Sequence, residues 1–304
     1  MIVQGWSGWP PGALHLTFGV FDGVHRGHQE LVRELVRGAH AAGARAVVGT
    51  FDVHPARVVA PTRAPLALTS ADEKVDLLLA AGADDVVLWR FDRAFSEVEA
   101  QDFLARLAAA GQVRHILSGF DLVFGHERGG NIEVIRALGP RYGFTVSEGR
   151  EVLHGDLPIS SSRIRATLAH GQIEDANAML GREYGIRGTV VHGAGRGRGL
   201  GFPTINIATP SDRQLPGDGI YAMRVAIGGE VLPAAANLGV RPTFESSGAR
   251  LLEAFLLDVD RDLYGKLVEA RFVQRIRDER RFDSSDELRR QIATDVEAAR
   301  KALG

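Results

Sequence analysis

Two histidines lie three residues apart in the segment Phe21-Asp22-Gly23-Val24-His25-Arg26-Gly27-His28, directly after a short apolar run. Imidazole groups can donate hydrogen bonds to the oxygens of a phosphate under attack and so stabilise charge that develops in the transition state. The two glycines let the backbone approach a ligand closely. The segment therefore predicts a phosphate-binding site. A solvated turn and a metal site that recruits His54 and His126 are the alternatives, although zinc usually takes three or four protein ligands.

A second candidate site is the segment 193–206, which reads GAGRGRGLGFPTIN. It contains neither G-x-G-x-x-G nor G-x-x-x-x-G-K-[ST], the two common nucleotide-binding templates. We interpret it as a flexible loop whose N–H groups and arginines surround phosphates. Thr204 and Asn206 would share one side of an extended strand, where a hydroxyl and an amide oxygen could help to hold Mg²⁺. The alternative is an RNA-binding arginine-glycine tract, but the tract is short and runs directly into the apolar residues 200–203.

The elements that must position the histidines alternate between short apolar runs and helical periodicity. Predicted strands cover residues 14–20, 46–51, 85–89, 113–117 and 144–146. Helices are predicted between them, with capping boxes at Ser70 and Glu73 and at Ser96 and Glu99. This alternation predicts parallel βαβ units in a doubly wound sheet. The histidine segment then lies at the carboxyl edge of the sheet, where ligands bind and a helix N-terminus offers N–H groups.

The pattern changes from about Gly188. Short β-like runs cover residues 189–191, 220–227, 231–236, 252–257 and 267–273, with glycine and proline clusters between them. They predict a small antiparallel barrel or sandwich. A capping box at Ser284 and Glu287 opens a final helix. We expect a boundary near residues 181–185, hence two domains over 1–180 and 183–304.

Composition narrows the function classes. The chain has 304 residues, a net charge of −2, 45% hydrophobic residues and no cysteine. This charge balance gives no support to a general nucleic-acid binder, and the lack of cysteine excludes disulfides and thiolate sites. The N-terminus does not read as a signal peptide, and no apolar run approaches the length of a membrane span. We therefore expect a cytoplasmic protein with no membrane partner.

Four segments of the first half resemble the HxGH nucleotidyltransferase superfamily and, more narrowly, the bacterial bifunctional riboflavin kinase/FAD synthetase family. The family's GxFDGxHxGH segment is matched by residues 19–28, and its TFDxHP segment by residues 50–55. Residues 119–125 resemble its GxDFxFG-like loop with Leu122 in place of Phe, and residues 159–165 its ISSTxIR-like motif with Ser162 in place of Thr. The four motifs occur in the family's order.

The resemblance implies roles for individual residues of the first domain. His25 and His28 would contact the ATP phosphates and the transition state. The ATP-binding loop would include Gly19, Phe21, Asp22 and Gly23. Ser161, Ser162 and Arg165 would bind phosphate from a second helix start, where the alternative is a simple helix cap followed by a solvated arginine. The flavin nucleotide and adenine would lie near Phe51, His54, Asp121 and Phe124.

The resemblance continues into the second half, where the riboflavin kinase motif GxVxxGxxxGRxLGFPTAN is matched from Gly188 to Asn206 with Ile205 in place of Ala. Residues 219–222, 237–244, 252–258 and 262–265 resemble further motifs of the module. Glu253 falls where the family places its catalytic base. ATP phosphates would be bound by Gly193, Arg198, Gly201, Thr204 and Asn206, with Thr204 and Asn206 also holding the metal. Arg277 and Phe282 would belong to a loop that covers the flavin ring.

The resemblance thus implies a Rossmann-like HxGH nucleotidyltransferase domain followed by a small antiparallel β-barrel riboflavin kinase domain with a C-terminal helix. It implies ATP-dependent conversion of riboflavin to FMN and of FMN to FAD, with a divalent cation such as Mg²⁺. Three alternatives stay open. They are an enzyme with only one of the two activities, a nucleotidyltransferase for a phosphopantetheine or nicotinate nucleotide, and a non-catalytic flavin reservoir. The oligomeric state is also open.

Overall fold

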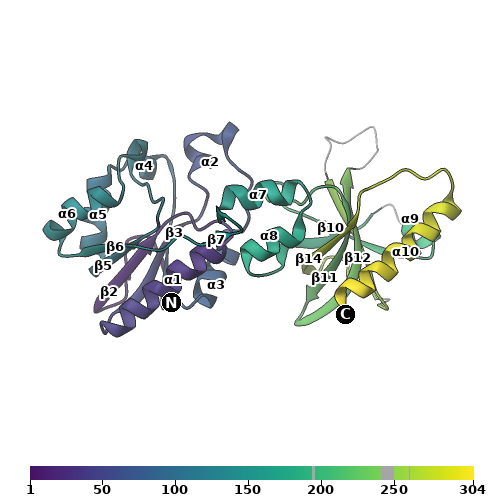
Figure 1. Ribbon diagram of the computed structural model, residues 1–304, viewed down its shortest axis with the longest axis horizontal. Coiled ribbons are helices and arrows are strands. Elements are labelled where there is room, and N and C mark those ends of the chain that lie inside the picture. The colour runs from purple at the N-terminus through teal and green to yellow at the C-terminus, as the bar shows by residue number, and fades with distance from the viewer. Residues whose placement is uncertain (194–195, 241–249, 260) are drawn as a thin grey trace. The chain divides into compact units, whose positions relative to one another are not determined.

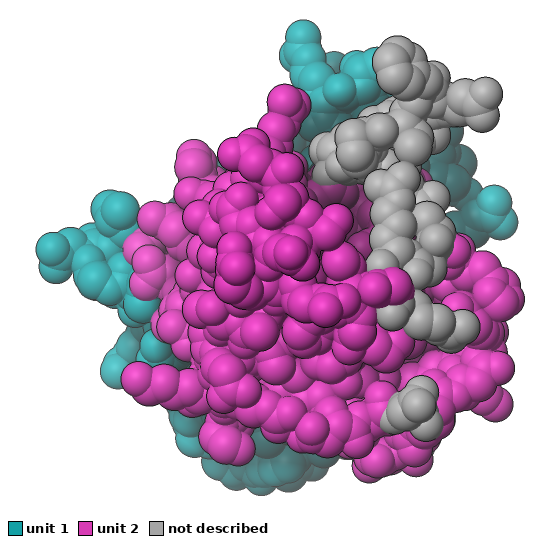
Figure 2. Space-filling model, turned by 90° about the vertical axis from the view of Figure 1, so that its right-hand side faces the viewer, with its two compact units in different colours: residues 1–161 teal, residues 162–304 magenta. Residues whose placement is uncertain are grey.

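The computed structural model describes residues 1–193, 196–240, 250–259 and 261–304. The chain forms two compact units, Met1–Ser161 and Ser162–Gly304, which are coloured separately in Figure 2. Each unit is built around its own sheet (Figure 1). Within the described residues, none of the helices combines the length and the apolar character needed to cross a membrane.

The first unit contains a six-stranded sheet in the order β1-β4-β3-β2-β5-β6, in which every pair of neighbours is parallel. The strands are β1 (Ile2–Gln4), β2 (Ala13–Phe18), β3 (Arg45–Phe51), β4 (Asp85–Trp89), β5 (Gln112–Ser118) and β6 (Thr145–Glu148). From β2 the chain builds outward to β3 and β4, then returns to place β5 on the other side of β2. This reversal is the topological switch point at which doubly wound sheets bind ligands. The predicted fold class is confirmed.

Helices cover both faces of this sheet (Figure 1). They are α1 (Arg26–Ala41), α2 (Ala56–Val59), α3 (Ala71–Ala80), α4 (Arg93–Ser96), α5 (Ala100–Ala110) and α6 (Ile132–Tyr142), with short 3-10 turns at Pro61–Arg63 and His126–Arg128 and a small hairpin of β7 (Leu153–His154) and β8 (Leu157–Pro158). Side chains of α1 and α3 pack with Val48 and Val86 in one core, and those of α5 pack with Val47 and Val87 in the other. Successive strand residues therefore alternate between two buried faces, which explains why the strands read as continuous apolar runs.

An aromatic cluster occupies the core on the α5 side. Trp6, Trp9 and Trp89 lie within 6.5 Å of one another by ring centroids, and Phe95 and Phe103 also contact Trp6 and Trp89. The ring of Trp89 crosses the strand beside it so closely that a Cβ on Gly49 would lie 2.2 Å from it. Glycine is required there because the indole occupies the space of any side chain.

The capping predictions have different outcomes in the structure. Ser70 and Glu73 form the reciprocal capping box at the start of α3, and the Ser284 side chain accepts the N–H of Glu287. The box predicted at Ser96 and Glu99 is wrong. Ser96 ends α4 and donates to the carbonyl of Arg93, and α5 begins after Glu99, which makes no side-chain capping bond.

The second unit contains a closed antiparallel barrel in the strand order β10-β13-β12-β11-β14-β9. Its strands are β9 (Tyr184–Val191), β10 (Thr204–Ala208), β11 (Gly219–Ile227), β12 (Glu230–Val240), β13 (Arg250–Leu256) and β14 (Leu267–Arg277). The short helix α9 (Arg196–Gly199) precedes β10, and the C-terminal helix α10 (Ser285–Leu303) packs on the outside of the barrel. Of the two architectures that the sequence left open, the structure has the barrel.

The helices α7 (Ser161–Ala169) and α8 (Ile173–Leu180) fall in the second compact unit apart from Ser161. Asn177 joins α8 to the barrel, because its amide donates to the carbonyl of Phe272 and accepts the N–H of Tyr184. The carbonyl of Leu168 accepts the N–H of Gly217. The contacts of the chain thus divide between residues 161 and 162. A functional boundary between residues 180 and 183 stays a prediction.

Candidate active sites

The histidine segment forms a tight turn between β2 and α1. Phe21, Gly23 and Val24 have positive φ angles of 50°, 80° and 38°, so the chain reverses within a few residues. His25 is the N-cap of α1, and its Nδ1 accepts the backbone N–H of His28 at 3.4 Å. The turn therefore stacks the two imidazole rings, with 3.6 Å between their centroids. The structure brings the predicted histidine pair together at the helix start.

The surroundings of His28 favour its neutral form. Burial, followed by the charges of His25 and Lys74, holds the pKa of His28 well below its usual value. Its Nδ1 is buried and has no hydrogen-bond partner within the described residues. Buried polar atoms normally have a hydrogen-bond partner. This nitrogen, partnerless among the described residues, therefore indicates that a bound ligand completes this site. The ring edge of Phe21 contacts the imidazole, with 5.0 Å between centroids, and fixes its orientation.

Asp22 is buried, and its carboxylate is directed at a neighbouring loop. It accepts the N–H groups of Leu68 and Thr69 at 3.0–3.1 Å and the Thr69 hydroxyl at 3.3 Å. Thr69 in turn accepts the N–H of Gly23. These contacts give Asp22 a structural role in holding the turn. Its predicted contact with ATP stays a prediction.

The predicted phosphate residues at the start of α7 belong to different units. The Ser161 hydroxyl donates to the carbonyl of Asp22 at 2.8 Å, and both residues belong to the first unit. Ser162 and Arg165 belong to the second unit, and their roles stay predictions. Gly19 needs no special explanation, because a Cβ there would make only ordinary contacts with the ring of Phe21.

The residues predicted near flavin and adenine occupy different environments. Phe51 is 9% exposed and contacts Trp89, Phe91 and Phe95 in the core. Phe124 is half-buried against Phe18 and Phe103. The Nδ1 of His54 accepts the N–H of Ala56 at the start of α2, and Asp121 is exposed. Within the part of the chain that the structure describes, these contacts do not identify a flavin site, so the four roles stay predictions.

The metal alternative for the histidines finds no support in the described part of the chain. His126 bonds the carbonyl of Ser96 through its Nδ1. No three His, Asp or Glu side chains in the described ranges gather as a metal site.

In the second unit, three polar residues form a row across neighbouring strands. Glu253 on β13 pairs in register with Asn206 on β10 and with Asn237 on β12. Directly paired residues of antiparallel strands project their side chains to the same face. The amide oxygens of Asn206 and Asn237 are both buried and have no hydrogen-bond partner within the described residues. Two acceptors without donors beside a carboxylate indicate a site for a cation or a donor group.

The predicted phosphate loop approaches this row through Gly193. A Cβ on Gly193 would lie 2.1–2.5 Å from the amide of Asn206, so the loop can pass there only without a side chain. Gly201 has a φ of 87°, in the left-handed region. Thr204 is half-buried and lies two residues before Asn206 on β10. The side chain of Arg198 and residues 241–244 of the predicted loop lie outside the described residues.

We expect Gly193→Ala to lower riboflavin phosphorylation about 10–100-fold, because a displacement of Asn206 by about 1 Å misplaces the groups that it holds. Gly38→Ala is the control, since a Cβ at Gly38 would make only an ordinary contact at 3.9 Å and the residue lies in the other unit. Steady-state rates of FMN formation measure the effect. Equal losses in both variants would contradict the assigned role of Gly193, and adenylylation of supplied FMN reports whether the first unit is intact.

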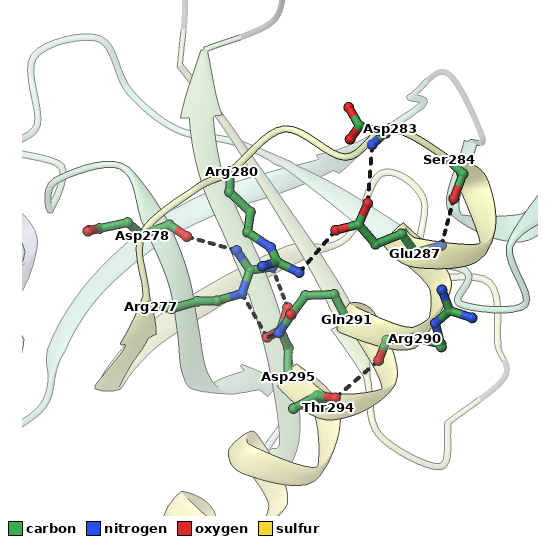
Figure 3. Close-up of polar contacts among 10 residues, drawn as sticks. All are labelled: Arg277, Asp278, Arg280, Asp283, Ser284, Glu287, Arg290, Gln291, Thr294 and Asp295. Atoms are coloured by element: carbon green, nitrogen blue, oxygen red, sulfur yellow. Dashed lines mark hydrogen bonds and ion pairs between the residues drawn. The ribbon is translucent and has the colours of Figure 1, made fainter.

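Arg277 lies at the end of β14 and is bound to α10 (Figure 3). Its Nε and Nη2 donate to the Asp295 carboxylate at 2.8 and 2.6 Å, and its Nη1 donates to the carbonyl of Asp278. Gln291 also donates to Asp295, which is 4% exposed. These hydrogen bonds give Arg277 a structural role at the start of the loop 278–284. Direct flavin contact by Arg277 stays a prediction.

The rest of that loop is held by α10 as well (Figure 3). Glu287 accepts the N–H of Asp283 and forms an ion pair with Arg280. The Arg280 guanidinium lies 4.7 Å from the ring centroid of Phe282, which is half-buried. A Cβ on Gly239 would meet the Glu279 carboxylate, so the loop also reaches β12 two residues beyond Asn237. The loop that carries Phe282 therefore lies near the polar row.

Sequence reasoning missed two residues that the structure draws attention to. The sequence assigns Lys74 no role, although a lysine directly before the largely apolar run 75–80 of the same helix is a usable signal. Asn237 was noted within a motif but given no role. Its pairing with Glu253 depends on strand register, which the sequence does not reveal.

Comparisons with known proteins match both halves of the chain. The FAD synthetase family profile matches residues 11–163, and the riboflavin kinase family profile matches residues 180–303. A bifunctional riboflavin kinase/FMN adenylyltransferase of Escherichia coli strain K12 is 39% identical over 95% of this chain and 92% of that protein. Those of Haemophilus influenzae and Bacillus subtilis are 38% and 32% identical over 94% and 93% of the chain and 92% and 90% of their own lengths.

A solved structure from Streptococcus pneumoniae, described as a macrolide-efflux protein, has a TM-score of 0.88 and 32% identity to this chain. It covers 99% of this chain and 98% of its own. The efflux activity in that description is a statement about the Streptococcus pneumoniae protein and is not carried over to this chain. The identities and coverage of the curated relatives show that this chain belongs to the bifunctional riboflavin kinase/FMN adenylyltransferase family.

Proposed function

We propose that the chain phosphorylates riboflavin to FMN and then adenylylates FMN to FAD, at two sites on separate units. The observation that supports this most strongly is the pair of separate polar constellations. One is the stacked imidazole pair at the start of α1, and the other is the row of Asn206, Glu253 and Asn237 on the barrel. Each falls in a segment matched by one of the two family profiles.

In adenylyl transfer, a phosphate oxygen of FMN attacks the α-phosphorus of ATP, and the bond to pyrophosphate breaks. His28 is neutral near pH 7 because its pKa is lowered, so one ring nitrogen carries a proton to donate to a phosphate oxygen. His25 is held parallel to it by the cap geometry. Both groups are fixed before substrate binds, so little reorganisation is needed as charge develops.

In riboflavin phosphorylation, the 5′-hydroxyl of riboflavin attacks the γ-phosphorus of ATP, and ADP leaves. Glu253 accepts the proton of that hydroxyl. A divalent cation, when bound, neutralises phosphate charge. Asn206 and Thr204 fit that cation, because the Asn206 amide oxygen is buried without a partner and both residues offer the oxygen ligands that Mg²⁺ prefers. The main chain at Gly193 and at Gly201 then approaches the phosphates.

Chromatography of flavins tests the proposal, after incubation of the purified chain with riboflavin, ATP and Mg²⁺. We expect FMN to appear first and FAD to follow. FMN without FAD would assign another substrate, or none, to the first unit. If neither product forms while the chain still binds flavin, the result would favour the flavin reservoir. We place the protein in the cytoplasm, where these substrates and ATP occur together.

A further inference from the structure

Lys74 is a buried charged residue that neither reaction step uses. It lies on α3 and is 5% exposed. Its ammonium donates to the carbonyl of Val20 at 3.1 Å and to that of Phe51 at 2.6 Å. Val20 follows β2, and Phe51 ends the adjacent strand β3. One side chain thus joins the carboxyl ends of two neighbouring parallel strands at the edge where the histidine turn begins.

We propose that Lys74 is a positioning residue for adenylyl transfer, which fixes the start of the turn that carries His25 and His28 and places a buried positive charge beside that turn. The inference rests on the proposed function of the first unit. The turn has a second attachment at Asp22, whose carboxylate holds residues 68 and 69. The Thr50 hydroxyl also donates to Val20 at 3.1 Å. Lys74 is the cationic member of this set.

The cost of burying Lys74 argues that it does more than fill space. Desolvation lowers its pKa to about 8, against the opposing charges of Asp22 and Asp52. The carboxylates of both aspartates accept main-chain N–H groups. An apolar side chain of similar length would avoid this desolvation cost. The lysine therefore provides what an apolar residue could not, namely two charge-assisted bonds to strand ends and a charge near His28.

That charge acts on His28, since Lys74 is among the groups that lower the histidine's pKa, after burial and His25. Loss of the charge should therefore raise the pKa of His28. The same ammonium loses its proton near pH 8, so its charge is present below that pH and absent above it. Asp22 and Asp52 favour the protonated lysine, whereas burial opposes it. FAD formation that depends on this charge should decline as the pH rises through about 8.

The experiment compares Lys74→Met, Lys74→Arg and Ser70→Ala with the native chain. Ser70→Ala removes the cap of the same helix without touching Val20 or Phe51. It therefore separates a weakened α3 from the loss of the two bonds. FAD formation from supplied FMN is measured from about pH 6 to pH 10, and the pKa of His28 is followed by NMR. Riboflavin phosphorylation serves as the internal control.

We expect Lys74→Met to lower the rate of FAD formation about 100-fold, to remove the decline near pH 8 and to raise the pKa of His28. Lys74→Arg should move the decline to higher pH because arginine stays charged. Ser70→Ala should leave both the pH profile and the His28 pKa as in the native chain. A folded Lys74→Met variant that forms FAD at the native rate, or keeps the native pH profile, would overturn the inference about Lys74 and leave the proposed function intact. No FAD from the native chain would overturn the proposed function and this inference with it.

Discussion

Replacing His28 by alanine lowers FAD formation about 10²–10³-fold and leaves FMN formation at the native rate. The variant removes a fixed hydrogen-bond donor from the transition state, and the loss of one such donor has an effect of about this size. FMN formation is spared because the barrel has its own candidate base and phosphate loop, and His28 belongs to the other unit. Separate assays with riboflavin and with FMN as substrate measure the two rates.

His40→Ala is the matched control for this variant. His40 lies in the last turn of the same helix, is exposed and bonds Asp84. Its removal tests whether any histidine-to-alanine change in α1 disturbs the unit. The assignment of His28 fails if both variants lose FAD formation equally, or if His28→Ala reduces FMN formation as strongly as FAD formation in a folded protein.

Replacing Glu253 by glutamine has the reverse effect. The amide keeps the shape of the side chain but cannot accept the proton of the 5′-hydroxyl, and the loss of a positioned general base costs about 10²–10⁴-fold. Phosphorylation of riboflavin should therefore fall by that factor, while FAD formation from supplied FMN continues. The two activities are read by flavin chromatography in parallel reactions.

Glu230→Gln provides the comparison on the same barrel. Glu230 begins β12 and is paired with Arg261 at the exposed surface, far along the strand from Asn237. A kinase rate in Glu253→Gln that matches the rate in Glu230→Gln would contradict the assignment of Glu253 as the base. A drop confined to Glu253→Gln supports its role as the base.

The parallel sheet of the first unit and the antiparallel strands of the second followed from periodicity and glycine placement, which left a barrel and a sandwich open for the second unit. Alternating apolar runs and helices were enough to predict a parallel sheet, since a chain of this kind can cover both faces only by crossover helices. The pairing of the two histidines could also be predicted from the sequence, because the turn, the N-cap and the helix start involve only neighbouring residues. The cap at Ser70 was found for the same reason. The failed cap at Ser96 shows the limit, since a short helix α4 ends where the pattern suggested a start.

The remaining features depend on contacts between distant segments. Asn237 gains its place beside Glu253 only through the register of β12 and β13. Phe51 reads as a motif residue, yet the tryptophan of β4 and two phenylalanines enclose it. Lys74 reads as one charge among many on a helix, and only the fold shows that its ammonium meets the ends of two strands. Arg277 likewise reads as part of a charged run, although a buried aspartate on α10 holds it.

The aromatic cluster of the first unit has a practical optical consequence. The chain has three tryptophans, and all of them, Trp6, Trp9 and Trp89, contact one another in that cluster. Intrinsic indole fluorescence is therefore emitted by the first unit only, and the barrel contributes no indole emission. A denaturant titration followed by indole emission reports the unfolding of the sheet unit. The same titration followed by far-ultraviolet circular dichroism reports both units, so the difference between the two curves isolates the stability of the barrel without dividing the chain.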